Sequence, residues 1–277
     1  MDIQQISDYL QHFKGTNLDA NVLNQLSEIK KNAVIQENQE ESKHIWCLEQ
    51  IYKVKELFLS TYKQLVNKEY YSAWCLLERT EIELHFLRRH LNYSRNEYGL
   101  KFIERNVDQL QKLFPYQYFS SRESIVKKWS CSICNQVISL RNPCGHNVGE
   151  IYNGEQCFRV ASDIEFQAFA IVTNPFDKYS VLFPEGKEYN YFMLENLMKN
   201  WTNPYENWKL NISMVLHEEF KGLDMNDLCA CKSNKKYEEC CLKTGKDKHE
   251  HYNLLFEKKD YKNFKSLSKQ TFNSWKK

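Results

Sequence analysis

Glycine and proline are scarce in this chain. Only 8 of its 277 residues are Gly and 5 are Pro, so few tight turns are expected and helices are favoured. No stretch of eighteen apolar residues occurs, and no basic segment followed by an apolar run opens the chain. These absences predict that the chain has neither a membrane span nor a secretory signal.

An excess of charge of one sign is also missing. The chain carries 38 basic and 36 acidic residues, and this near-balance argues against a protein that coats nucleic acid. The charge is nevertheless uneven, because residues 243–277 form a lysine-rich tail. A hydrophobic content of 42% with 14% aromatic residues is sufficient for a substantial core.

Familiar catalytic motifs are absent as well. The sequence contains no glycine-rich phosphate loop, no G-x-S-x-G nucleophile elbow and no H-E-x-x-H zinc-protease helix. Catalysis is therefore unsupported by local motifs, although an active site assembled from distant residues would not be detected in this way.

Cysteine, in contrast, is plentiful, and its ten residues are grouped. Eight lie in two clusters with the spacing of metal ligands, which does not suggest a secreted disulfide scaffold. The other two, Cys47 and Cys75, fall within apolar helical patterns. This usage predicts a protein of the reducing cytoplasm.

The C-terminal cluster has the pattern C-x-C-x8-C-C, formed by Cys229, Cys231, Cys240 and Cys241. Four thiolates so spaced predict a closed tetrahedral zinc site, which is structural because no position remains for an activated water. Three lysines in the intervening loop are expected to compensate the negative charge and to lower the thiol pKa values. They are Lys232, Lys235 and Lys236, followed by Tyr237 as an aromatic lid.

This stretch closely resembles the SEC-C motif, the small zinc module at the C-terminus of the bacterial translocase motor SecA and of many otherwise unrelated bacterial proteins. The resemblance covers about fifteen residues and includes the four ligand positions, Ser233, the Lys-Lys-Tyr and the final Cys pair. The family usually carries Gly on both sides of the Ser, whereas Lys232 and Asn234 stand here.

The resemblance implies a docking element in a zinc-binding adaptor protein. Its partner would be a protein, the ribosome or nucleic acid, reached through the module and the basic tail. The contacting residues would be Lys232, Lys235, Lys236 and Tyr237.

A second cluster joins Cys131 and Cys134 to Cys144 and His146. A C-x-x-C knuckle followed by C-G-H can surround a second zinc ion with three thiols and one imidazole. Cys157 competes for the fourth position, because a strand passing the knuckle can present it. Alternatively, Cys144 and Cys157 are ordinary buried thiols and His146 is a turn residue.

One helical segment offers an enzymatic alternative. Arg79 and His85 form an R-x5-H pattern that loosely resembles the motif of HEPN-type ribonucleases. Six residues of helix, however, leave the two side chains about 120° apart. The other interpretation is a solvated helix face with i,i+4 pairs.

The periodicity of apolar residues predicts an α+β architecture. Helices are expected over about 19–33, 41–66, 73–91, 100–114 and 191–201, and strands over 157–160, 166–173 and 179–183, with a tight hairpin at Asn153-Gly154. The aromatic residues from Phe114 to Phe119 can stack on nucleic acid or pack between domains, and without a clustered basic face packing is favoured.

Four segments follow from these patterns. They are an all-helical domain at 1–118, a central zinc-stabilised α+β domain at 119–222, the SEC-C zinc module at 223–245 and a basic helical tail at 246–277. The helical tail rests on Leu254, Leu255, Lys258, Tyr261 and Phe264 at helical spacing.

Overall fold

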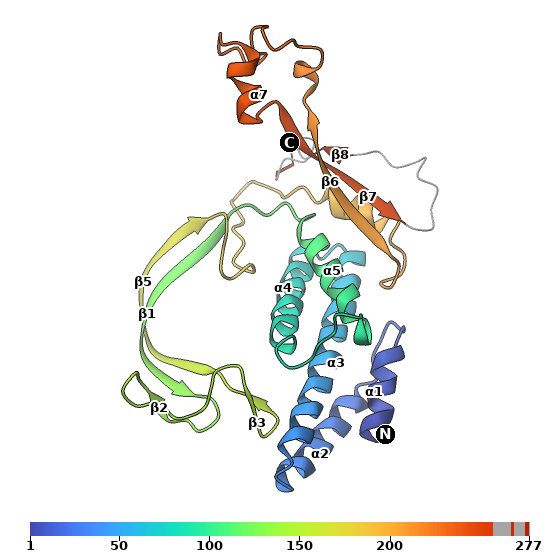
Figure 1. The fold of residues 1–277 in the computed structure, drawn as a ribbon, viewed down its shortest axis with the longest axis vertical. Helices are drawn as coiled ribbons and strands as arrows, with labels where there is room; N and C mark the ends of the chain where they lie inside the picture. Colours follow the sequence, from blue (N-terminus) through green and yellow to red (C-terminus); the bar gives the residue numbers. More distant parts are fainter. Residues whose placement is uncertain (257–266, 269–274, 277) are drawn as a thin grey trace. The chain divides into compact units, whose positions relative to one another are not determined.

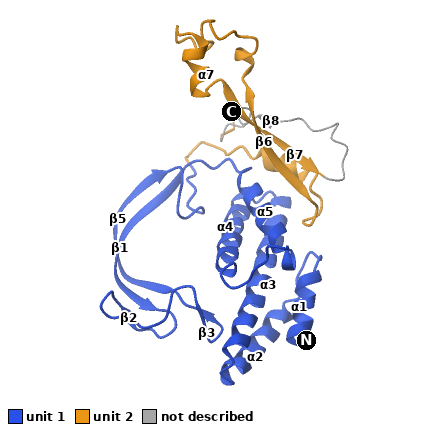
Figure 2. Ribbon diagram, in the orientation of Figure 1, with its two compact units in different colours: residues 1–183 blue, residues 184–277 orange. Residues whose placement is uncertain are grey.

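The structure is a computed structural model that describes residues 1–256, 267–268 and 275–276. The chain divides into two compact units, residues 1–183 and residues 184–277 (Figure 2). Both helices and antiparallel sheets are present, so the predicted mixed α+β class is confirmed. The predicted domain boundaries stay predictions. In the described part of the chain, no helix has both the length and the apolar character to cross a membrane.

The first unit begins with five α-helices and a short 3-10 helix, shown in blue to green in Figure 1. They are α1 (Ile3–His12), α2 (Asn21–Ile35), α3 (Gln39–Val66), α4 (Tyr70–Leu87), η1 (Glu97–Gly99) and α5 (Leu100–Gln111). Four of the α-helices were expected from periodicity. The fifth, α1, was not, although Asp2 and Gln5 close a capping box at its start.

The long helix α3 is the centre of this helical part, because it packs against α1, α2, α4 and α5. Its buried stripe includes Ile45, Leu48, Ile51 and Phe58, each at most 1% exposed. Only three residues separate α2 from α3 and α3 from α4. The helices therefore bury one another's apolar faces.

A long two-stranded ribbon follows the helices. It pairs β1 (Phe119–Cys131) with β5 (Arg159–Val172) in antiparallel register, and β2 (Val137–Ile138) adds a short third strand. Figure 1 shows the ribbon as a curved pair of strands. The sequence predicts two strands, at 157–160 and 166–173, but the structure has one strand, β5, that runs from the first range into the second. The prediction missed this continuity because polar residues around Asp163 interrupt the apolar pattern. The strand expected at 179–183 makes one isolated bridge, Phe119 with Val181.

One end of the ribbon is fixed to α4. The carboxylate of Glu78 accepts hydrogen bonds from the backbone N–H groups of Lys178 (2.5 Å) and Tyr179 (2.7 Å). The indole of Trp74 donates to the carbonyl of Lys178 and packs against the rings of Phe114, Tyr116 and Phe119. These aromatic residues therefore pack between helices and ribbon, as the sequence favoured.

The other end is fixed by a small hairpin, β3 (Ile151–Tyr152) with β4 (Glu155–Gln156), around the predicted Asn153-Gly154 turn. Gln39 at the start of α3 donates to the carbonyl of Ile151 and accepts from the N–H of Asn153. Lys30 on α2 donates to the carbonyl of Gly154 and pairs with Glu155. The hairpin prediction is confirmed, and its anchoring is a tertiary feature.

The second unit contains α6 (Phe192–Met198) and the sheet β6 (Trp208–Leu216), β7 (Lys248–Phe256) and β8 (Leu267–Ser268). The predicted helical tail is wrong over residues 248–256. There Tyr252, Leu254 and Phe256 are buried at a period of two and the strand pairs with β6 along its whole length. A partner strand about forty residues upstream overrides the local helical spacing. Residues 257–266, 269–274 and 277 of that tail lie outside the described residues.

Candidate metal centres

The four C-terminal thiols converge in the structure. The sulfurs of Cys229, Cys231, Cys240 and Cys241 all lie within 4.8 Å of one another. Two of the separations are 3.5 Å, between Cys231 and Cys240, and 4.0 Å, between Cys240 and Cys241. Tetrahedral coordination with bonds of about 2.3 Å places sulfurs about 3.8 Å apart, so this cluster fits one metal ion.

Backbone hydrogen bonds bring the two halves of this site together. An isolated bridge joins Leu228 to Lys236, and the N–H of Cys229 donates to the carbonyl of Lys235. The last two ligands then fall at the junction between η3 (Tyr237–Glu239) and α7 (Cys241–Thr244). The loop between the pairs of thiols is thus a small closed hairpin.

The reversal of that hairpin uses left-handed backbone at two positions. Lys232 has φ 62° and Asn234 has φ 57°, the region that favours Gly and that Asn tolerates better than Lys. These are the two positions where the SEC-C motif usually carries Gly. The chain therefore keeps the turn geometry although it lacks the glycines.

We expect Lys232→Gly to stabilise the metal-loaded module by about 0.5–1 kcal/mol. Relief of a left-handed Lys favours the folded state by about 1–2 kcal/mol, and the greater freedom of unfolded glycine offsets part of that gain. Asn234→Gly should give less. Thermal unfolding of the full chain at fixed zinc measures both, and a lower unfolding temperature for Lys232→Gly would contradict the strain argument.

A serine hydroxyl, the neighbouring thiols and burial shift the pKa values of two of these thiols. The pKa of Cys231 is lowered to about 6, first by a hydrogen bond from Ser233 and then by the neighbouring thiols. Ser233 also lies 3.1 Å from the sulfur of Cys240. Burial, by contrast, raises the pKa of Cys241 to about 12. The expectation that the lysines lower the thiol pKa values is not supported at these positions, because the causes at Cys231 and Cys241 are the hydroxyl, the neighbouring thiols, burial and the backbone.

The module has a very small apolar core. Phe220 and Tyr237 are each 5% exposed and pack with Cys229 and Cys241, and Leu216 and Leu223 lie against them. The hydroxyl of Tyr237 donates a 2.6 Å hydrogen bond to the fully buried Asp247. Tyr237 is therefore a core residue, which corrects its predicted place on the partner-binding surface.

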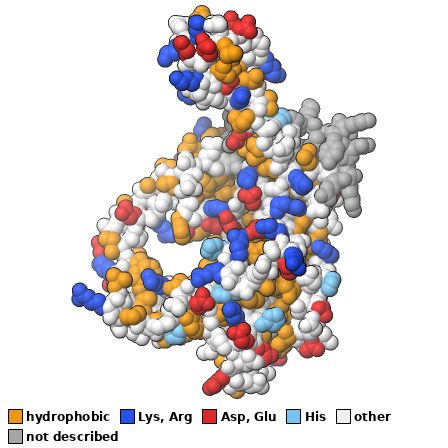
Figure 3. Space-filling view, in the orientation of Figure 1, with side chains coloured by type: hydrophobic (Ala, Val, Ile, Leu, Met, Phe, Trp, Pro, Cys, Tyr) orange, Lys and Arg blue, Asp and Glu red, His pale blue; other side chains and the backbone are white. Residues whose placement is uncertain are grey.

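Lysines of the loop remain at the surface. Lys232, Lys235 and Lys236 are all exposed, and Lys236 donates to the side chain of Asn226. Figure 3 shows Lys and Arg side chains on the lobe that contains α7. No signal in the sequence identifies Asp247 as the partner of Tyr237. Asp247 lies in a lysine-rich segment, where an acidic residue is expected to face solvent and pair with a neighbouring lysine.

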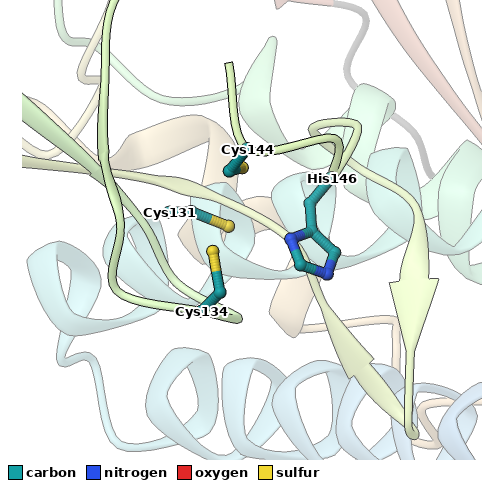
Figure 4. Close-up of side chains that lie close together, drawn as sticks. All are labelled: Cys131, Cys134, Cys144 and His146. Carbon is teal, nitrogen blue, oxygen red and sulfur yellow. The ribbon is translucent and has the colours of Figure 1, made fainter. Parts of the chain in front are cut away.

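The second predicted cluster also converges. The sulfurs of Cys131, Cys134 and Cys144 and a ring nitrogen of His146 lie within 4.8 Å of one another, and Figure 4 shows the imidazole beside the three sulfurs. The Nδ1 atom of His146 is buried and has no hydrogen-bond partner in the structure. A buried ring nitrogen without a donor or acceptor is what a metal ligand presents before it binds the ion.

The knuckle of this site forms where β1 ends. Asn135 turns the chain with φ 57°, and the N–H of Ile133 points at the sulfur of Cys131 at 3.4 Å. The backbone N–H of Cys134 is the largest cause that lowers the pKa of Cys131 to about 6. The knuckle therefore favours a thiolate at Cys131.

The competing thiol, Cys157, is close to the same site. Its sulfur lies 3.8 Å from that of Cys131 and it is only 1% exposed. Burial raises the pKa of Cys157 to about 11. A cavity of about 400 Å³ adjoins the site and has Cys131, Cys144, His146 and Cys157 in its wall. The structure thus brings four candidate ligands together and places Cys157 close by as a fifth candidate.

The residues of the enzymatic alternative do not meet. Arg79 is paired with Glu83 at 2.8 Å, and that carboxylate also binds Lys53. His85 is exposed at the surface of α4, with its ring against Phe86. Arg79 thus makes an i,i+4 pair with a buried carboxylate, while His85 lies at the exposed surface of the same helix.

All ten cysteines lie in the described part of the chain, and each is a free thiol. Comparison with curated proteins and with solved structures finds no match to the chain. The SEC-C motif family model matches residues 225–243, a segment that contains the converging thiols Cys229, Cys231, Cys240 and Cys241. The chain therefore carries a SEC-C motif whose four cysteines are arranged to hold a metal ion.

Proposed function

We propose that this chain is a cytoplasmic zinc-binding docking protein, whose SEC-C module attaches it to a protein partner or to the ribosome. The observation that carries the proposal is the convergence of four sulfurs within 4.8 Å in the segment that the SEC-C model matches. Four thiolates in a tetrahedral arrangement are typical of structural zinc. The metal would then hold the shape of the module and supply no reaction.

The size of the module supports this role for zinc. A core of two aromatic rings with a few aliphatic side chains is too small to fold without help, and structural metals commonly supply the difference. The Cys131 centre would act similarly. It would brace the end of the ribbon, where the Nε2–H of His90 donates a 2.8 Å hydrogen bond to the carbonyl of Gly149.

The surface of the module supports protein docking. Met225 and Leu228 are 61% and 68% exposed, and Leu242 is also exposed. The exposed lysines Lys232 and Lys235 belong to the same short segment, residues 225–243. Apolar side chains bordered by cations fit a partner surface that offers an apolar patch with carboxylates around it.

The proposal is tested by affinity capture from a native bacterial lysate with the full chain at fixed zinc. We expect Lys232→Glu/Lys235→Glu to lose most of the captured partner while zinc content is unchanged. The reversed charges would repel an acidic partner surface. The control is Lys31→Glu, a charge reversal on α2 of the other unit.

Equal capture by all three proteins would contradict docking through this loop. Loss of capture together with loss of zinc would show only that the variant had disturbed the module. Measuring the metal on the same samples separates these results.

A further inference from the structure

The ribbon of β1 and β5 exposes an unusual amount of apolar surface. Ile164, Phe166, Phe169 and Ile171 are 57%, 60%, 67% and 64% exposed, and Figure 3 shows hydrophobic side chains along this curved ribbon. Single exposed apolar residues are ordinary, but a contiguous row of large ones marks an interaction site. Neither the SEC-C module nor the metal centres account for this row.

A β-bulge places the whole row on one face. Ile164 lies opposite Val126 and Phe166 opposite Ser124, and then the register shifts by one residue at Gln167. After the shift, Phe169 lies opposite Arg122 and Ile171 opposite Ser120. Since side chains alternate between faces, an unbulged strand would have sent Phe169 and Ile171 to the other side.

The resulting surface, here called the aromatic face, has two lanes about 5 Å apart. The β5 lane is apolar and consists of Val160, Ile164, Phe166, Phe169 and Ile171, with Ser162 between them. The β1 lane is cationic and hydroxylic and consists of Ser120, Arg122, Ser124, Val126, Lys128 and Ser130.

The carboxylates of the ribbon lie on the opposite face. Glu123 lies opposite Ala168 and Glu165 opposite Ile125, and Glu165 pairs with Lys127 at 2.6 Å on that side. Asp163 stands between Ser162 and Ile164 with a left-handed backbone (φ 52°) and has no partner residue in the β1 register. Among the residues of the aromatic face that pair across the ribbon, the charged ones are Arg122 and Lys128, both cations.

We propose that the aromatic face binds single-stranded nucleic acid. Two phenylalanine rings about 7 Å apart along the strand can each take one base on their π-faces. Arg122, directly across from Phe169, and Lys128 would contact phosphates, with serine hydroxyls beside them. A chain with a net charge of only +2 is compatible with this site, because the paired residues of the face separate its cations from Glu123 and Glu165.

The charge pattern is what selects this occupant. Two copies of the chain packed by this face would bring cations together with no carboxylate to oppose them. A polyanion with stackable bases is complementary to both lanes. The proposed docking role of the SEC-C module neither requires nor supplies this activity.

The test is fluorescence anisotropy of a labelled twelve-nucleotide oligo(U) titrated with the full chain. We expect Phe166→Ala/Phe169→Ala to weaken binding on the order of a hundredfold, about tenfold per lost stacking contact. The matched control is Ile125→Ala, which removes a 51% exposed apolar side chain from the opposite face of the same ribbon. It should bind as the unaltered chain does.

Arg122→Gln provides a second readout that a folding defect would not produce. The slope of log K against log salt should become shallower by about 0.7 for one lost phosphate contact. Equal affinities for the double-Phe variant and the unaltered chain would overturn the proposal. So would equal losses for the double-Phe variant and Ile125→Ala, or a dimer that dissociates on the Phe substitutions without any binding of oligo(U).

Discussion

The Cys241→Ser variant is expected to purify with one zinc ion per chain, and the unaltered chain is expected to purify with two. Cys241 is 4% exposed and its sulfur completes the C-terminal cluster. A serine hydroxyl does not ionise at neutral pH and cannot replace a thiolate in a four-sulfur site. Structural zinc contributes about 10–16 kcal/mol to small metal-dependent folds, far more than the core around Phe220 and Tyr237 can supply.

We therefore expect the module to unfold in this variant while the helices of the first unit persist. Elemental analysis gives the zinc content, and hydrogen exchange should show unprotected amides in residues 225–243 only. The control is Cys75→Ser, because Cys75 lies on α4 outside both clusters. It should keep two ions. A Cys241→Ser chain with a full complement of zinc would refute the four-sulfur site.

The second large effect is expected from replacing Lys55, which should make the protein more stable. This lysine lies on α3 and is only 4% exposed, and burial, with a smaller contribution from Lys14, lowers the pKa of Lys55 from the usual 10.5 to about 8. That difference corresponds to about 3 kcal/mol of destabilisation at neutral pH, where the buried amine is charged. Lys55→Met should therefore raise the free energy of unfolding of the helical part by about 3 kcal/mol at pH 7.

The pH dependence has a definite sign. Below pH 8 the amine is protonated in the folded and unfolded states, so the full cost is present. Between about pH 8 and 10.5 the unfolded state binds more protons than the folded state, and stability rises with pH. The advantage of Lys55→Met over the unaltered chain should therefore shrink across this window.

Urea unfolding followed by circular dichroism at several pH values measures this difference. Lys53→Met is the matched control, because Lys53 is on the same helix but partly exposed and paired with Glu83 at 2.6 Å. It should change stability by less than about 1 kcal/mol. An advantage of Lys55→Met that is constant from pH 7 to pH 10.5 would show that the gain comes from packing and not from removal of a charge.

Local patterns predicted much of this protein. The apolar stripes of α2 to α5, the Asn153-Gly154 hairpin and the two Cys clusters all follow from residues close in sequence. The left-handed turn at Asn234 was also predictable, because the turn residue carries its own preference. Each of these features depends on a few consecutive residues.

Long-range pairing accounts for the errors. The tail segment Lys248–Phe256 has a spacing that fits a helix, but its pairing with Trp208–Leu216 makes it a strand. Tyr237 was predicted to lie on a partner-binding surface. In the structure it is buried, because its hydroxyl donates to Asp247 and its ring packs against Phe220. Cys157 could be named as a competitor for the second centre, yet only the fold places its sulfur 3.8 Å from that of Cys131.

The sequence by itself determined which residues are available for metal binding, because the type and spacing of the ligands are properties of the sequence. The tertiary structure decided what surrounds them: the hydroxyl of Ser233 on the thiols, the unpartnered Nδ1 of His146, and the bulge at Gln167 that gathers Phe166 and Phe169 on one face. The physical reason is that coordination geometry can be encoded over a dozen residues. Burial, hydrogen-bond partners and strand register depend on segments that meet only when the whole chain folds.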